Sequence, residues 1–190
     1  IFIIKNINTN FLLNTILITS AFYLFFISLK DLIYKGFKNF AQSIAHFGFS
    51  LFILSILLNN FFSTEIITNL KVGETYNSER FKINFESINQ KNERNFKAVI
   101  GKFTIKNSDG AIDVLNPELR IYNQPNIITS EADIKTNLLE DKFMTMNKVQ
   151  NQEYFNIRYQ EKPFMVWIWF SVILISFGGL ISLTKKKHEN

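Results

Sequence analysis

One histidine inside an apolar stretch is the residue of this chain best suited to chemistry. The stretch Phe40–Phe62 contains His46 but no Asp, Glu, Lys or Arg. An ionisable side chain at membrane depth is costly, so it is a candidate functional residue that requires a partner. On a helical wheel His46 shares one face with Gln42, Ser43, Ser50, Ile53 and Leu57. The opposite side gathers the small residues Ala41, Ala45 and Gly48.

This pattern predicts that the polar face of the helix, with His46, points into a helix bundle. The small residues on the other side would let a neighbouring helix approach closely. Three roles are open to His46. It could make an interhelical hydrogen bond, worth about 0.6–2 kcal/mol. It could relay protons, although no second ionisable residue lies at similar depth. It could bind haem iron as neutral imidazole in an apolar pocket lined by Phe47 and Phe49, with a second ligand from outside this chain.

The rest of the sequence excludes several kinds of site. The 190-residue chain has no Cys, which removes disulfides, thiolate metal sites and thiol redox chemistry from the chain itself. Its polar segment, residues 65–162, has no His, so a Ser-His-Asp triad and a His-ligated metal are excluded within it. His188 lies in a polar tail and is interpreted as inert. Lys162 is interpreted as an anchor where the polar segment joins the next apolar run.

Three apolar runs, residues 11–29, 40–62 and 163–183, are long enough to span a bilayer. The net charge of +5 could indicate nucleic-acid binding, but residues 65–162 hold 14 basic and 14 acidic residues. The excess charge lies in Lys30, Lys35 and Lys38 and in Lys185, Lys186 and Lys187, and short Lys-rich loops favour the cytoplasmic side. Both clusters predict one topology, with the polar domain outside and Trp167 and Trp169 at the outer interface.

Alternating apolar and polar residues predict strands in the polar segment. Phe81, Ile83 and Phe85 alternate with polar residues. The same alternation with polar residues occurs at Phe103 and Ile105 and again at Phe155, Ile157 and Tyr159. Ser108, Asp109 and Gly110 predict a hairpin turn. Residues 130–133 could cap a short helix. The predicted fold class is a membrane α-helical protein with three transmembrane helices and a small external antiparallel β domain, a sandwich or barrel of about six strands.

The predicted domain order follows from these elements. It comprises a loop end at 1–10, transmembrane helices at 11–29, 40–62 and 163–183, a cytoplasmic loop at 30–39, an external β domain at 65–162 and a cytoplasmic tail at 184–190. The chain begins with Ile, and we expect it to be a piece of something longer, either a fragment or the product of a split gene.

A family resemblance follows from motifs taken in chain order. They are Ala45-His46-Phe47-Gly48, Phe62-Ser63-Thr64-Glu65, Leu70-Lys71-Val72-Gly73-Glu74, Leu115-Asn116-Pro117-Glu118-Leu119-Arg120-Ile121-Tyr122, Thr129-Ser130-Glu131-Ala132-Asp133-Ile134, Tyr159, Lys162-Pro163-Phe164, Trp167-Ile168-Trp169 and Gly178-Gly179. In this order and spacing they resemble the C-terminal part of the CcmF family, the haem-lyase component of bacterial-type cytochrome c maturation.

The resemblance implies specific roles. His46 matches one of two membrane histidines that hold a b-type haem in such proteins, and the other ligand lies on helices outside this chain. The implied partners are the remaining CcmF-type helices or subunit, a haem chaperone, apocytochrome c with its thiol-handling partners, and quinol as electron donor. The implied location is the bacterial inner (plasma) membrane or, alternatively, the mitochondrial inner membrane. Docking of partners is expected at Glu118, Arg120, Tyr122 and Glu131.

This chain departs from the family in several places. It lacks the tryptophan-rich motif with its flanking histidines and the other haem ligand, so we do not expect it to be a complete catalyst. Leu119 stands where the family usually has Lys, and Ile66 where it usually has Arg. The main alternative function is a structural membrane module with a partner-binding β domain and no haem role. A proton-coupled transporter fragment is a third, disfavoured by the lack of a second intramembrane ionisable residue.

Overall fold

The computed structural model describes residues 11–34, 39–108, 110–150 and 153–188, without the side chains of residues 11, 12 and 185–188. Some predicted features therefore lie outside the described residues: the loop end at 1–10, Lys35, Lys38, Asp109 and the side chains of the final Lys cluster and His188. The described chain divides into two compact units. The β unit comprises Thr64–Thr136 and Lys142–Glu161. The helical unit comprises residues 11–63, Asn137–Asp141 and residues 162–188.

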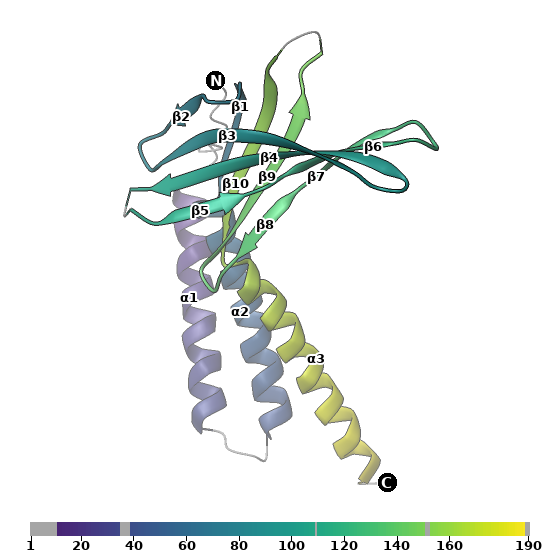
Figure 1. Ribbon diagram of the computed structural model, residues 1–190. Coiled ribbons are helices and arrows are strands. Elements are labelled where there is room, and N and C mark those ends of the chain that lie inside the picture. Colours follow the sequence, from purple (N-terminus) through teal and green to yellow (C-terminus); the bar gives the residue numbers. More distant parts are fainter. Residues whose placement is uncertain (1–10, 35–38, 109, 151–152, 189–190) are drawn as a thin grey trace. The chain divides into compact units, whose positions relative to one another are not determined.

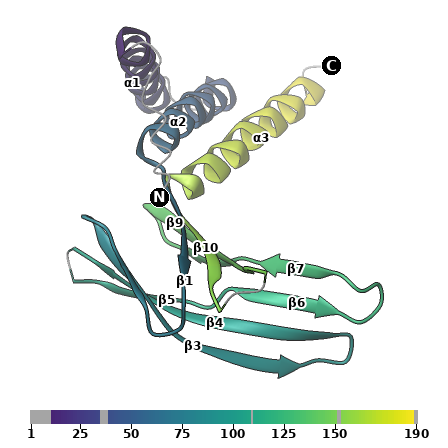
Figure 2. The same ribbon diagram turned by 90° about the horizontal axis from the view of Figure 1, so that it is seen from above.

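The helical unit contains α1 (Phe11–Tyr34), α2 (Phe40–Phe62) and α3 (Met165–His188). All three are long and apolar enough to cross a membrane. In both ribbon views α2 lies between α1 and α3 (Figures 1 and 2). α1 continues past the predicted end at Leu29, through Lys30 and Asp31, because no Gly or Pro interrupts it there. α3 begins at Met165 because Pro163 still belongs to the preceding strand.

The β unit is built from two sheets. The first has the strand order β1-β10-β9-β8 and consists of β1 (Thr64–Leu70), β10 (Phe155–Pro163), β9 (Glu140–Lys148) and β8 (Asp133–Thr136). The second has the order β2-β3-β4-β6-β7, with β5 also paired to β4. Its strands are β2 (Thr75–Asn77), β3 (Phe81–Asn92), β4 (Phe96–Asn107), β5 (Ile112–Leu115), β6 (Glu118–Tyr122) and β7 (Ile128–Glu131).

The core lies between the two sheets. The alternating residues of β3, β4 and β10 identified from the sequence all belong to it. Phe85 stacks on Phe103, with ring centroids 4.2 Å apart, and meets Phe155 edge-on at 5.7 Å. β1 and β9 close the core with apolar residues that include Ile66, Leu70, Met144 and Met146. The predicted antiparallel β domain is therefore confirmed as a β-sandwich.

Two details of the predicted β domain were wrong. The described residues form ten strands rather than about six, because strands such as β2, β7 and β8 are too short to show alternation. Residues 130–133 do not cap a helix but pass from β7 into β8. Ser130 pairs with Leu119 of β6, and its hydroxyl donates to Met146 O (2.8 Å). Pairing with neighbouring strands overrides the local capping motif.

Candidate functional site

The packing of α2 against α3 depends on small residues. A Cβ atom at Gly178 of α3 would lie 2.8 Å from Ala41 O and from Ala45 Cβ. A Cβ atom at Gly48 would lie 3.0 Å from Leu174 Cβ and from two atoms of Ile175. Close helix approach through small side chains is a common mode of packing between membrane helices. The seam predicted from Ala41, Ala45 and Gly48 therefore faces α3.

A second side of α2 packs against α1. Ser50 Oγ and Ser28 Oγ of α1 hydrogen-bond to each other, with either one as the donor. The hydroxyl that accepts this bond is free to donate to a carbonyl of its own helix, Phe25 O for Ser28 or Phe47 O for Ser50. The rings of Phe25 and Phe47 lie 5.5 Å apart between centroids. Ser43 is buried as well. Helix α1 therefore covers one edge of the face that was predicted to be continuous and polar.

The third side of α2 is open. It carries Gln42, His46, Phe49, Ile56 and Asn60, which are all exposed and follow one stripe of the helix. The predicted polar face thus splits, since Ser43 and Ser50 contact α1 or lie buried while His46 does not. No described residue donates a hydrogen bond to His46 or accepts one from it. Within this chain His46 points away from α1 and α3, and the interhelical hydrogen bond is not formed among the described residues.

The open stripe is compatible with one axial ligand of a haem. A haem ligand needs an accessible imidazole with apolar and aromatic neighbours. His46 meets this requirement, since Phe49 and Ile53 lie one and two turns further along the same side of α2. The described residues contain no group of three or more His, Cys, Asp or Glu side chains suited to a metal ion. The stripe can therefore supply one ligand and part of a pocket wall, and its remaining walls must come from other helices.

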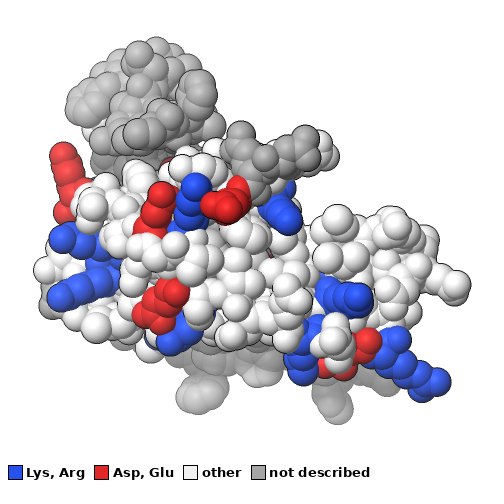
Figure 3. Space-filling model, turned by 45° about the horizontal axis from the view of Figure 1, so that its top comes forward, with Lys and Arg blue, Asp and Glu red and all other residues white. Residues whose placement is uncertain are grey.

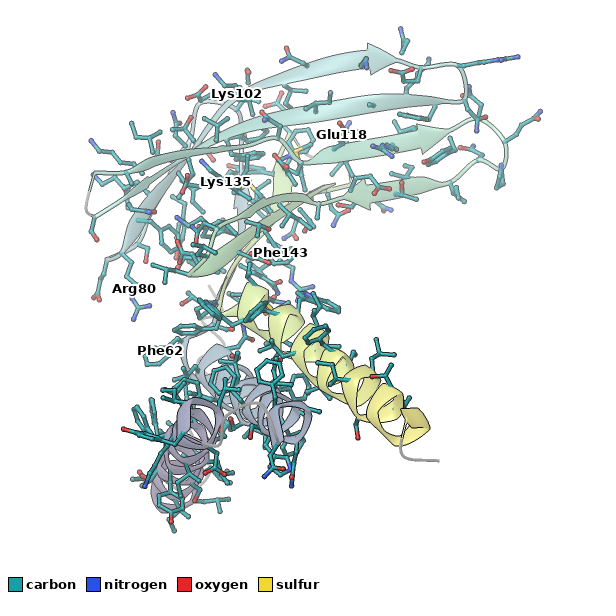
Figure 4. All side chains as sticks on the ribbon, turned by 90° about the horizontal axis from the view of Figure 1, so that it is seen from below. Phe62, Arg80, Lys102, Glu118, Lys135 and Phe143 are labelled. Carbon is teal, nitrogen blue, oxygen red and sulfur yellow. The ribbon has the colours of Figure 1, made fainter. Side chains whose placement is uncertain are left out.

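The predicted docking residues meet on the second sheet. Glu118, Arg120 and Tyr122 alternate along β6 and so share the face opposite the core, and Glu131 of β7 stands in register with Glu118. We call these four residues the β6 face. Arg120 Nε donates to Glu118 Oε2 (3.0 Å), and the guanidinium lies 5.0 Å from the centre of the Phe96 ring. Figure 4 marks Glu118 on its strand.

The electrostatics of the β6 face hold Arg120 in its charged form. Hydrogen bonds to Glu118 and Tyr122 raise the pKa of the Arg120 guanidinium further above its usual value. Ala98 of β4 pairs with Lys91 of β3 on one side and with Arg120 of β6 on the other. It is only 2% exposed, so the longer side chains around it cover this part of the face. Basic and acidic side chains are interspersed on the surface that Figure 3 shows. The face suits a partner with mixed polar groups rather than a polyanion.

Sequence reasoning missed a charged cluster that joins strands of the two sheets. Asp113 of β5 contacts Lys135 of β8 (2.5 Å) and Lys142 of β9 (2.7 Å). The side chains of Lys142 and Asp113 are only 4% and 15% exposed. Partial burial raises the pKa of the Asp113 carboxyl, but the hydrogen bonds from the two lysines outweigh it and lower that pKa. No local pattern could reveal the cluster, because its members are far apart in the sequence.

The junction between β10 and α3 also positions side chains. Phe164 adopts a left-handed backbone conformation (φ 62°), and its carbonyl accepts hydrogen bonds from Trp167 N and Ile168 N. Asn59 Nδ2 of α2 donates to Pro163 O (2.6 Å). Lys162 is half-buried and has contacts, as expected of an anchor. The motif Lys162-Pro163-Phe164 thus begins α3 next to the end of α2.

The sequence of this chain is similar to a protein family and to individual proteins. A family model described as the CcmF C-terminal β-sandwich matches residues 61–163. The cytochrome c-type biogenesis protein CcmF of Pseudomonas fluorescens is 27% identical over 82% of this chain and 24% of its own length. The cytochrome c-type biogenesis protein ccl1 of Rhodobacter capsulatus is 26% identical over 80% of this chain and 23% of its own length.

The fold is also similar to that of a solved structure. The solved structure of a cytochrome c haem lyase CcmF superposes on 93% of this chain and 35% of its own, with a TM-score of 0.60 and 16% identity. The chain spans about a quarter of the length of the curated relatives it matches. The family model covers more than half of the chain and includes both sheets of the β unit. The chain therefore belongs to the CcmF family, of which it contains the C-terminal β-sandwich.

Proposed function

We propose that this chain forms the C-terminal part of a cytochrome c maturation haem lyase and that His46 supplies one axial ligand of a membrane b-type haem. The observation that carries the proposal is the exposure of His46 on the open stripe of α2. An uncovered imidazole on a membrane helix must meet protein or a cofactor rather than lipid. Membership of the CcmF family supports a cofactor.

The chain contributes one residue that would bind the haem iron and others that would exclude water from it. His46 would bind the iron through a neutral ring nitrogen, which leaves its other nitrogen for a hydrogen bond. Phe49 of the open stripe and the half-buried Ile53 next to it would keep water from that side of the ligand. A b-type haem with two protein ligands carries single electrons. The second ligand would come from helices outside this chain, so the chain is not a complete catalyst by itself.

The β unit would serve as the docking domain. We infer that it lies on the external side of the bacterial inner membrane, because the Lys-rich flanks favour the cytoplasm. Its partners would be the haem chaperone and apocytochrome c, which the β6 face would contact through Arg120 and its acidic neighbours. The mixed charges of this face support recognition by paired polar contacts, which give specificity more than affinity.

A reduced-minus-oxidised absorption spectrum of the assembled membrane complex tests the ligand role. His46→Ala should lose the b-type signal, whereas His188→Ala, which removes the other histidine of the chain, should retain it. Immunoblotting would verify that both variants assemble. If His46→Ala assembles normally and keeps the signal, the chain is a structural membrane module and the ligand role is wrong.

Charge reversal tests the docking role independently. Arg120→Glu should reduce co-purification of apocytochrome c several-fold, because it places a third acidic group beside Glu118 and Glu131. Arg80→Glu is the matched control, since Arg80 is an exposed arginine of the β unit away from the β6 face (Figure 4). Equal recovery of apocytochrome c with both variants would remove the β6 face from the docking surface.

A further inference from the structure

The tight turn between β8 and β9 carries two adjacent exposed leucines. Leu138 and Leu139 are 69% and 68% exposed, among the most exposed large apolar side chains described. The turn belongs to the helical unit, together with α2 and the start of α3. Exposed apolar side chains are ordinary when they are isolated, but an adjacent pair at the tip of a turn requires an explanation.

The backbone of this turn is hydrogen-bonded internally. Asn137 Oδ1 accepts hydrogen bonds from Leu139 N and Glu140 N, both at 2.8 Å. Asn137 N donates to Glu140 O (3.0 Å). The asparagine side chain thus closes a rigid turn that holds the leucines outward.

The same turn is hydrogen-bonded to the first turn of α3. Leu139 O accepts from Phe164 N, and Leu138 O accepts from Trp167 Nε1, both at 2.8 Å. Three of the four backbone polar groups of the two leucines therefore have partners. This matters because a segment can enter the apolar part of a bilayer only when its backbone polar groups are satisfied.

The level of the turn along α3 follows from these hydrogen bonds. Helix α3 is a candidate membrane span from Met165 to Thr184, so Trp167 lies in its first turn. Trp169 is strongly exposed nearby, and Asn59 ties the end of α2, with exposed Phe62, to Pro163. Trp residues gather at the membrane–water interface. The two leucines therefore stand at the same level as an aromatic belt.

We propose that the Leu138–Leu139 turn inserts into the interfacial layer of the bilayer as a membrane contact separate from the helices. Its occupant is the lipid at the boundary of head groups and acyl chains. Because Trp167 Nε1 donates to Leu138 O, the indole fixes the depth of the turn while its ring lies in the same layer. The turn thus ties the β8–β9 hairpin to the membrane surface.

Spin labelling tests the insertion, and the chain is suited to it because it has no native Cys. Leu138→Cys would be labelled in the full chain reconstituted in phosphatidylcholine vesicles. Collisions with oxygen, which concentrates in lipid, and with a water-soluble nickel complex would be measured. Ile173→Cys on the exposed face of α3 is the membrane control. Ile128→Cys of β7, an apolar residue of the β unit with 67% exposure, is the control for water.

The proposal expects the label at position 138 to have collision rates between those of the labels at 128 and 173, because the turn lies at the interface and Ile173 lies near the middle of the span. Its collision rate with the nickel complex should be several-fold lower than at 128, and its collision rate with oxygen should be higher. A label at 138 that collides with nickel as often as the one at 128 would place the turn in water. A label shielded from both reagents would place it against protein. Either result would overturn the proposal.

Discussion

The β unit and the helical unit solve the same packing problem in opposite ways. The β unit encloses its apolar residues between two sheets, with Phe85, Phe103 and Ile105 completely buried. The Asp113 cluster adds charged contacts between strands of both sheets. The β6 face of this unit lies on the side of the second sheet opposite the core.

The contacts that hold the helical unit together depend on small residues. Gly178 and Gly48 allow α3 to approach α2, and a pair of serines joins α1 to α2. One stripe of α2 stays uncovered, and His46 lies on it. Among the described residues, the β unit encloses its own core, whereas the helical unit leaves one face of α2 uncovered. The proposed haem ligand lies where the packing is unfinished.

The largest loss of stability should come from a substitution that leaves a cavity in the core of the β unit. Phe85→Ala should lower the free energy of unfolding of the β unit by about 3–5 kcal/mol, because it removes a fully buried ring. Phe49→Ala deletes the same ring from the open stripe of α2 and should leave the stability of the isolated chain nearly unchanged. Hydrogen exchange of β3 and α2 in detergent would measure both. Equal destabilisation would contradict the contrast between the two units.

The charged cluster should give the next largest effect. Asp113→Asn should destabilise the β unit by about 2–3 kcal/mol, between the values for exposed and buried ion pairs. Glu93→Gln, which removes an exposed pair with Lys91, is the control and should have little effect. Urea unfolding monitored by hydrogen exchange of β5 and β9 would compare them. A similar loss in both variants would show that burial of the cluster does not matter.

The same cluster predicts a pH dependence. The pKa of Asp113 is lowered in the folded chain, so its contribution is fully present above the unfolded value of about 3.9. It is lost as the pH falls from there through the lower folded pKa. Wild-type and Asp113→Asn chains should therefore differ in stability at pH 6 and converge below about pH 4. A difference that persists unchanged at the lowest pH would contradict this assignment.

A smaller effect is expected at the seam between α2 and α3. Gly178→Ala should destabilise the helical unit by about 1–2 kcal/mol, since the new methyl group overlaps Ala41 and Ala45. Gly179→Ala is the matched control, because no atom lies within 4 Å of a Cβ there. Fluorescence of Trp167 and Trp169 during titration with a denaturing detergent would report the change. Identical curves would mean that α3 does not depend on this seam.

The smallest effect should come from the β6 face. Arg120→Ala removes the ion pair with Glu118 and the contact with Phe96, but about a third of each side chain of the pair is open to solvent. Exposed pairs contribute little to folding. Its unfolding curve should overlay that of the wild type while partner binding falls. A clear loss of stability would indicate that the β6 face is structural rather than a docking surface.

Sequence periodicity accounted for the elements that have long, regular patterns. The apolar runs predicted α2 with its observed bounds, and alternation at Phe81, Ile83 and Phe85 predicted β3. Periodicity failed for β7 and β8, which are strands of four residues that depend on pairing with distant partners. The Asp113 cluster escaped for the same reason, since long-range contacts leave no local signal.

The candidate site was only partly predictable. The sequence singled out His46 and the small residues Ala41, Ala45 and Gly48, and residue types alone sufficed for both. A helical wheel could not assign a neighbour to each side, so Ser43 and Ser50 were grouped with His46 although they turn toward α1 or the interior. Sequence also left the exposed Leu138 unremarked, because its importance depends on a hydrogen bond to Trp167.

The central claim is that His46 binds haem iron from the open stripe of α2. Replacing the ligand tests it more directly than removing it, and His46→Met keeps a side chain able to bind haem iron. A redox titration of the b-type signal in the assembled complex should then give a higher midpoint potential and an altered spectrum, because a methionine axial ligand raises the potential. A potential and spectrum unchanged from the wild type would contradict the claim.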